Sequence, residues 1–290
     1  DESGGDTFTD SSAQGNHGVL GNPPARETRL YKYHATAGER LFFDYQGVSG
    51  DNFSLRIFDP QGNLLYGPQW FSNDVDTFTA TKDGDYLFAL EGRIYNSSAS
   101  QYQFALLAID DVQAAMALDT RIDGTLAKPG QRNAYSFSVL TPTMAVFDSL
   151  TYDNNFQWSL AGPDGTLVSN RGFVYSDSAE YGSNPLLMLA PGDYTLTVDG
   201  VAGTSGNFAF QLLDLATAST LAALGSPIVG NLTPGSLTRS YRFEADSGDS
   251  ISFDRIALSG GSPYWRLIDA TGFQVFASGT PNGRGTTSLR

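Results

Sequence analysis

The sequence predicts an all-β protein, a tandem array of antiparallel β-sandwich domains of jelly-roll or immunoglobulin-like size, and two observations support this class. The first is an internal repeat of about 105 residues, in which the step Phe43-Asp44 recurs at Phe147-Asp148 and at Phe253-Asp254. A fixed period of this kind is typical of an array of small domains. The second is that each copy consists of short alternating apolar and polar segments separated by turn residues, without a convincing amphipathic helix.

The second copy gives the fullest picture of one repeat. Turn residues at Lys128–Gly130, Pro163–Gly165 and Pro191–Asp193 divide it, because proline presets φ and glycine accepts the positive φ that turns need. The alternation between these turns predicts about eight short strands. They cover Met116–Leu126, Tyr135–Val139, Ala145–Asp148, Trp158–Leu160, Leu167–Val168, Leu186–Leu189, Tyr194–Val198 and Phe208–Leu212.

The repeat sets the domain boundaries. We expect an N-terminal extension or linker at residues 1–17, repeat 1 at 18–113, repeat 2 at 114–219 and repeat 3 at 220–290. Repeat 3 lacks about two strands, because the period places them beyond Arg290. Residues 1–17 hold Phe8 as their single large apolar side chain, which is not the pattern of a core strand. Trp158 and Trp265 occupy matching positions and are expected in the cores.

Composition excludes several classes of function. With 40% hydrophobic and 12% aromatic residues, the chain can bury ordinary cores. The formal net charge of −14 argues against nucleic acid as a partner, since phosphates need a basic face. No run approaches the roughly 18 apolar residues of a membrane span, and no segment resembles a signal peptide. The chain has no cysteine, which excludes disulfides and thiolate metal sites.

Several short motifs follow one another in a fixed order across the repeats. They are Gly230–Gly235, Tyr241–Phe243, Gly248–Asp254, Trp265–Gly272, Pro191–Leu196 and Phe210–Asp214. In that order they resemble bacterial pre-peptidase C-terminal domains, and more closely the related sandwich repeats of very large bacterial surface and secreted proteins. The resemblance covers residues 18–290. It implies an exported, non-catalytic module used for spacing, adhesion or substrate docking, and such modules sometimes carry calcium.

Asp44, Asp148 and Asp254 occupy one position of the three repeats, directly after a phenylalanine. Calcium prefers several hard oxygen ligands, so these carboxylates are weak candidates for calcium ligands. The interpretation we favour is an aspartate that caps a turn after a buried phenylalanine, because the neighbouring acids differ between the copies. Apart from calcium, no cofactor is expected.

Tyr66, Trp70 and Phe71 are weak candidates for a ligand or partner surface. Trp70 has no counterpart in the other copies, and these three side chains together would form an exposed aromatic platform for a sugar or a protein. The favoured alternative is that Trp70 packs across a domain junction. Asp85 and Asp193 each precede a tyrosine, and we expect them to bond the backbone of their own loops.

No catalytic constellation stands out in the sequence. His17 and His34 are the only histidines and have no serine or cysteine partner at a recognisable spacing. No zinc motif, phosphate loop or nucleophile elbow occurs, so we expect a protein that is not an enzyme. Three tripeptides fit the N-glycosylation pattern, at Asn52, Asn96 and Asn231.

Two functions remain from this evidence. The favoured one is a bacterial structural or adhesive protein, extracellular or on the cell surface. In its sharper form, strands of one chain complete repeat 3 of the next by edge-strand addition, which yields a head-to-tail filament. The partners are then copies of the chain itself, or other cell-surface proteins and glycans. The alternative is a carbohydrate-binding accessory region of a secreted enzyme, with Trp70 and Tyr66 as its platform.

Overall fold

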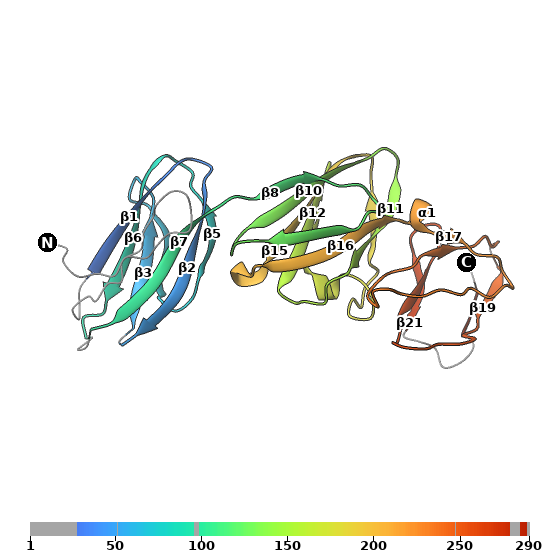
Figure 1. Cartoon of the computed structure of the whole chain (residues 1–290). Helices are drawn as coiled ribbons and strands as arrows, with labels where there is room; N and C mark the ends of the chain where they lie inside the picture. Colours follow the sequence, from blue (N-terminus) through green and yellow to red (C-terminus); the bar gives the residue numbers. More distant parts are fainter. Residues whose placement is uncertain (1–27, 51, 96–98, 247, 279–284, 289–290) are drawn as a thin grey trace. The chain divides into compact units, whose positions relative to one another are not determined.

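A computed structural model describes residues 28–290 apart from residues 51, 96–98, 247, 279–284 and 289–290 (Figure 1). The described part confirms the all-β class, since almost all of its regular elements are strands. Its short helical elements are α1 (Leu215–Ala218) and the 3-10 turns η1 (Phe173–Tyr175) and η2 (Val201–Gly203). No helix in this part is long and apolar enough to cross a membrane. The predicted extension at residues 1–17 lies outside it.

The chain packs as two units. The first comprises the described residues from Thr28 to Asp111 together with Ala127–Gln131 and Ala202–Ser205. The second comprises Val112–Leu126, Arg132–Val201 and the residues from Gly206 onward. Repeat 1 therefore forms the body of the first unit, whose longest segment ends at Asp111, and the boundary at residue 113 stays a prediction. Repeats 2 and 3 pack together within the second unit.

Repeat 1 is a sandwich of two antiparallel sheets, with strand orders β1-β6-β3-β4 and β5-β2-β7. Successive side chains of a strand point to opposite faces, so every second residue turns into the sandwich. In β3 the buried residues are Phe53, Leu55 and Ile57. The strands are β1 (Thr28–Ala35), β2 (Arg40–Ser49), β3 (Phe53–Phe58), β4 (Leu64–Trp70), β5 (Val75–Thr79), β6 (Gly84–Gly92) and β7 (Gln101–Ile109).

Repeat 2 is a larger sandwich, with strand orders β13-β12-β15-β10-β8 and β14-β11-β16-β9. Its core contains Trp158, which is fully buried, as expected. The indole stacks on Phe147 with ring centroids 4.1 Å apart, and its Nε1 donates a hydrogen bond to Ser176 Oγ at 2.7 Å. The strands are β8 (Val112–Ala115), β9 (Ile122–Leu126), β10 (Arg132–Val139), β11 (Thr143–Ser149), β12 (Phe156–Gly162), β13 (Gly165–Gly172), β14 (Leu186–Leu189), β15 (Gly192–Gly200) and β16 (Gly206–Asp214).

The two sandwiches share one topology. Strands β1 to β7 correspond in order and pairing to β10 to β16. The aromatic contact at the centre of each core also recurs: Phe43 stacks on Phe104 with ring centroids 4.7 Å apart, and Phe147 stacks on Phe210 at 5.1 Å. The periodic phenylalanine in the sequence therefore marks a buried position of the shared fold.

The single strand predicted over Met116–Leu126 is wrong. The chain forms β8 and β9 instead, and these belong to different sheets: β8 pairs in parallel with β10, and β9 pairs antiparallel with β16. Between them the chain crosses from one sheet to the other while Met116 and Leu118 pack against the core, as does Ile122 at the start of β9. The alternation in the sequence continues through this crossing, because the crossing residues also alternate between core and solvent.

Repeat 3 consists of three two-stranded ribbons in the part that the structure describes. β17 (Thr220–Leu221) pairs in parallel with β18 (Tyr241–Arg242), as β8 does with β10. β19 (Ser250–Phe253) pairs with β22 (Gly285–Ser288), as β11 does with β14. β20 (Trp265–Ile268) pairs with β21 (Gln274–Ser278), as β12 does with β13.

The strands of repeat 2 without a counterpart among these ribbons include its two central ones. β15 lies between β10 and β12, and β16 lies between β11 and β9. At the 106-residue spacing that relates Tyr135 to Tyr241, the counterparts of β15 and β16 would follow Arg290. Among the described residues, no strand lies in the middle of either sheet of repeat 3, and its strands are paired two by two. Trp265 is accordingly only half-buried, whereas its counterpart Trp158 is fully buried.

Candidate functional site

Only part of the predicted aromatic platform of Tyr66, Trp70 and Phe71 lies on the surface of the protein. Trp70, at the end of β4, is 45% exposed. Phe71 follows it, so its side chain points to the opposite face, where it lies in the core at 4% exposure. Tyr66 is half-buried and packs against the same core. Of the three predicted residues, therefore, Trp70 is the one that an external ligand reaches readily.

The exposed neighbours of Trp70 come from the segment after β6. The guanidinium carbon of Arg93 lies 3.6 Å from the centroid of the Trp70 ring and 5.1 Å from that of the Tyr95 ring. Tyr95 is 65% exposed, and Ile94 beside it is also exposed. We call Trp70, Arg93, Ile94 and Tyr95 the Trp70 surface. The sequence contained no signal for it, because Trp70 ends β4 and Arg93 directly follows β6, and these two strands become neighbours only through their pairing with β3.

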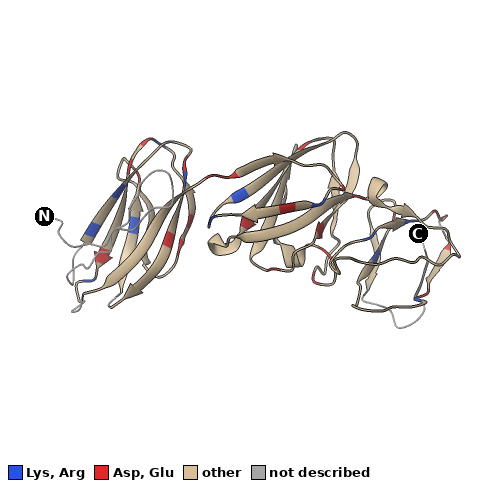
Figure 2. Ribbon diagram, viewed as in Figure 1, with Lys and Arg blue, Asp and Glu red and all other residues tan. Residues whose placement is uncertain are grey.

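The Trp70 surface lies at one end of the outer face of the sheet β1-β6-β3-β4. Ser54 of β3 is directly opposite both Trp70 of β4 and Glu91 of β6, which sets the three side chains in one row across the sheet. Glu91 forms an ion pair with Arg56 in the next row. Lys32 pairs with Asp85 further along the same face. Basic positions are visible on this sheet in Figure 2.

A second cluster contains Asp148, one of the predicted calcium ligands. Asp148 is completely buried at the end of β11, and its Oδ1 accepts the backbone N–H of Thr238 at 3.0 Å. Its Oδ2 accepts the side-chain amide of Gln211 at 2.6 Å. Asp177, which the sequence analysis did not single out, forms a hydrogen bond with Asp148 and accepts the Ser149 N–H at 2.9 Å. We call Asp148 and Asp177 the acid pair.

Burial sets the ionisation of the acid pair. It raises the pKa of Asp148, against the opposing effect of the hydrogen bonds from Thr238 and Gln211. It also raises the pKa of Asp177 to about 7, and the nearby negative charge of Asp148 adds to this shift. At neutral pH, Asp177 thus carries a proton part of the time and donates it to the Asp148 carboxylate.

Repeat 1 has a corresponding pair of aspartates, Asp44 and Asp74, which are less buried than the acid pair. Asp74 Oδ1 accepts the N–H of Tyr45 at 2.8 Å, as Asp177 accepts the N–H of Ser149. Asp44 accepts the side-chain amide of Gln46 at 2.9 Å. Burial raises the pKa of Asp74, and the charge of Asp44 contributes to the shift. The position that the sequence marked as Phe-Asp therefore holds a pair of carboxyl groups in both sandwiches.

The donor set at Asp148 does not fit calcium. Both carboxylate oxygens face N–H donors, which would repel a cation, and the second carboxyl of the pair accepts an N–H as well. Among the described residues, no three His, Cys, Asp or Glu side chains lie close enough to hold a metal ion together. Calcium binding by Asp44, Asp148 or Asp254 thus stays a prediction that no contact here supports.

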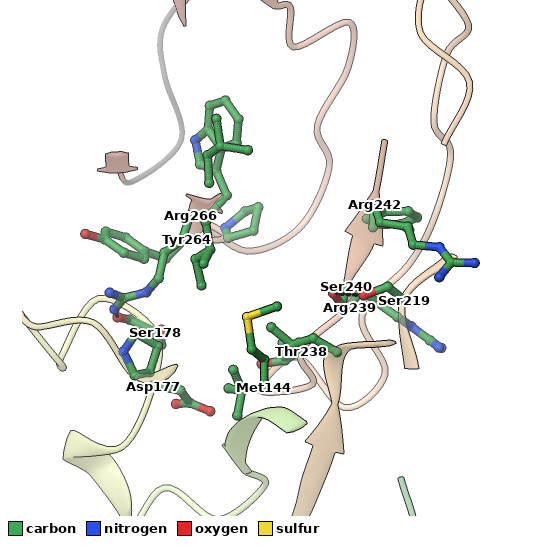
Figure 3. Close-up of a pocket in the computed structure, with 18 of the residues that line it drawn as sticks. Met144, Asp177, Ser178, Ser219, Thr238, Arg239, Ser240, Arg242, Tyr264 and Arg266 are labelled. Carbon is green, nitrogen blue, oxygen red and sulfur yellow. Dashed lines mark hydrogen bonds between the residues drawn. The ribbon is translucent and has the colours of Figure 1, made fainter. Parts of the chain in front are cut away.

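The acid pair lies where repeat 2 contacts repeat 3, beside a pocket of about 1580 Å³. Arg266 of β20 points toward Ser178 in the loop after Asp177 (Figure 3). Its guanidinium donates to the carbonyl oxygens of Ser178, Tyr181 and Ser183. The bonds to Ser183 and Tyr181 measure 2.8 and 2.7 Å. Arg266 and the Thr238 N–H are therefore polar contacts that hold repeat 3 beside the acid pair, and Asn184 Nδ2 adds a bond to the Gly272 carbonyl at 2.9 Å.

The remaining predicted residues have structural surroundings. Asp85 pairs with Lys32 and His34 across the ladder of β1 and β6, and Asp193 accepts the Ser138 hydroxyl at 2.6 Å. The expectation that they bond their own loops is wrong, because both lie within strands opposite polar partners. Of the three sequons, those at Asn52 and Asn231 have exposed asparagines. Asn96 lies outside the described residues.

The fold defines a protein built of β-sandwich repeats, and comparison with known proteins goes no further than the fold. No protein-family model and no curated protein matches the chain. A pre-peptidase C-terminal domain of Bacillus anthracis collagenase is 17% identical over 36% of this chain and 94% of that domain, with a TM-score of 0.27.

Two further solved structures have similar values. The CUB1-EGF-CUB2 region of human MASP-1/3 is 5% identical over 72% of this chain and 98% of its own, with a TM-score of 0.22. A Paenibacillus xanthan lyase is 12% identical over 73% of this chain and 25% of its own, with a TM-score of 0.24. Likenesses of this size carry no argument about function.

Proposed function

We propose that the chain is a non-catalytic structural or adhesive protein, extracellular or on the cell surface, in which tandem β-sandwich repeats provide length and attachment. The recurrence of chemistry-bearing residues supports this. Phe43 and Phe147 hold equivalent core positions, and the N–H of the residue after each following aspartate is bound by a second carboxyl group, that of Asp74 or Asp177. Residues that recur in each repeat serve the shared fold, whereas a catalytic site belongs to one place.

We further propose that chains join when a segment of another polypeptide completes repeat 3. The single observation that carries this is the pairing of its strands into ribbons, with both central positions open among the described residues. Open ladders expose unpaired backbone groups and apolar side chains, which proteins normally cover. Addition of one strand at an edge does not complete such a repeat, because each sheet needs a strand in its middle.

Light scattering of the chain across a range of concentrations tests this assembly. We expect multimers that a synthetic peptide spanning residues 192–214 disperses, because β15 and β16 are the strands that fill the two central positions in repeat 2. A peptide of the same composition in scrambled order is the control. A folded monomer near 31.1 kDa at every concentration would contradict the assembly.

The second candidate function is carbohydrate binding, and the Trp70 surface is the observation that favours it. Exposed aromatic rings pack well against the apolar faces of sugar rings. Trp70 and Tyr95 both offer exposed ring area at one end of a rigid sheet. Glycan-array binding that disappears in Trp70→Ala, with the melting temperature unchanged, would support this function. Binding that survives the substitution would remove the Trp70 surface as the site, and absence of binding by the unaltered chain would remove the function.

A further inference from the structure

Arg93 is a cation for which the described residues provide no acidic partner. On the outer face of the same sheet, Lys32 is paired with Asp85 and Arg56 with Glu91. Within the described part of the chain, the Arg93 guanidinium forms no ion pair and no hydrogen bond, and its contacts are the two aromatic rings. Its N–H groups form a planar fork that matches the two oxygens of a carboxylate. The fork is therefore available to an external anion.

The two rings hold this fork in place. The Arg93 guanidinium carbon lies 3.6 Å from the centroid of the Trp70 ring and 5.1 Å from that of the Tyr95 ring. These two contacts restrict the rotamers of Arg93 before any ligand arrives. A ligand then meets a cation that loses little further conformational freedom on binding. Exposed apolar area surrounds the cation, since Ile94 is 79% exposed and both rings remain partly open. The surface thus combines one anion-binding group with several apolar contacts.

A peptide strand is the less suitable occupant. β4 is the edge of its sheet, but its pairing with β3 shifts register twice. Pro68 within β4 has no N–H to offer, and bulges and prolines are the devices that prevent strand addition at an edge. A saccharide needs no continuous ladder, because it binds through ring faces and individual polar groups.

We propose that the Trp70 surface binds acidic saccharides, in which Arg93 receives a uronate carboxylate while Trp70 and Tyr95 pack against the sugar rings. A uronic acid unit carries an apolar C–H face and a carboxylate on one small ring, which is the combination that this surface complements. The assignment rests on the second function proposed above and adds the class of sugar.

Affinity gel electrophoresis with polygalacturonate and with alginate tests the assignment. We expect both polymers to retard the protein, and fully methyl-esterified polygalacturonate, whose carboxylates are capped, to retard it far less. Arg93→Ala and Arg93→Gln should each weaken binding by about tenfold or more, because a charge-assisted bidentate contact is lost. The affinity of Arg93→Lys should lie between that of the unaltered protein and that of the Ala and Gln variants, since lysine keeps the charge without the planar fork. Arg121→Ala, at an exposed ion pair with Asp123 in repeat 2, is the matched control.

Several results of this gel experiment would overturn the proposal. Absence of retardation by both acidic polymers overturns the proposal, as does an Arg93→Gln variant that binds like Arg121→Ala. Equal retardation by the esterified polymer, lost in Trp70→Ala, overturns the acidic assignment but leaves saccharide binding at this surface intact. If poly-glutamate retards the protein as strongly as the acidic polysaccharides do, the protein responds to negative charge in general, and the acidic-saccharide assignment is overturned.

Discussion

Asp177 donates a hydrogen bond to the buried carboxylate of Asp148, and the two residues meet at the contact between repeat 2 and repeat 3. Asp148 also accepts the Thr238 N–H from repeat 3. Two hydrogen-bonded carboxyl groups in a buried place share a proton, because two adjacent negative charges there repel each other. The attachment of repeat 3 to repeat 2 is therefore linked to protonation.

The stability of the second unit should fall as the pH rises from about 4 to about 8. The pKa of Asp177 is raised from 3.8 to about 7 by burial, so the folded state holds a proton that the unfolded state has already lost. A raised pKa of this kind stabilises the fold fully below the unfolded value and is lost as the pH passes through the folded value. Thermal unfolding followed by far-UV circular dichroism between pH 4 and pH 8 measures it, and a flat profile would contradict the linkage.

Asparagine at position 177 should abolish much of this pH dependence. Asp177→Asn keeps an oxygen for the Ser149 N–H and places a permanent donor toward Asp148, which imitates the protonated carboxyl. Asp148→Asn is the opposite case, because both of its oxygens already accept N–H donors and its amide group would face one of them. We expect Asp177→Asn to raise the melting temperature at pH 8 and Asp148→Asn to lower it at every pH. If both variants shift the melting temperature in the same direction, Asp177 is not the donor and Asp148 not the acceptor of their hydrogen bond.

Arg266 should control how firmly repeat 3 holds the loop after Asp177. Its guanidinium donates to three carbonyl groups of that loop, which an ammonium group at the same position does not match in geometry. We expect Arg266→Lys and Arg266→Ala to increase cleavage within residues 178–183 by a broad-specificity protease, one that does not cut specifically after lysine or arginine. Arg255→Ala, at another arginine of repeat 3, is the comparison. Identical cleavage in all three variants would show that the loop is fixed by other contacts.

Two tryptophans should respond very differently to truncation. Trp158→Ala removes a fully buried indole, its stack on Phe147 and its bond to Ser176, and we expect it to cost about 3–5 kcal/mol in the free energy of unfolding. Trp70→Ala removes an exposed ring and a cation–π contact, which is worth about 1 kcal/mol or less. Urea unfolding of both variants compares them, and costs of similar size would contradict the assignment of core and surface.

Calcium should not affect stability. The oxygens of Asp148 accept N–H donors from Gln211 and Thr238, and a cation would have to displace these donors. We expect the same melting temperature in EDTA and in millimolar calcium. A rise of several degrees on addition of calcium, reversed by EDTA, would restore the carboxylates as metal ligands.

The sequence predicts the sandwich class and the core well, because burial on one face leaves an alternating pattern that Phe147 and Trp158 report directly. It predicts the functional surfaces poorly. Phe71 follows Trp70 in the chain but points to the opposite face, so adjacency in sequence misleads within a strand. Arg93 and Asp177 acquire their partners through strand pairing and loop position, and neither belongs to a periodic motif.

Hydrogen–deuterium exchange of β19 and β20 at low and high protein concentration tests the central claim most directly. If another polypeptide fills the central positions of repeat 3, amides on these strands should become protected as assemblies form, while those of β15 and β16 in repeat 2 keep the same protection throughout. Protection of β19 and β20 that is independent of concentration would contradict completion by a second chain.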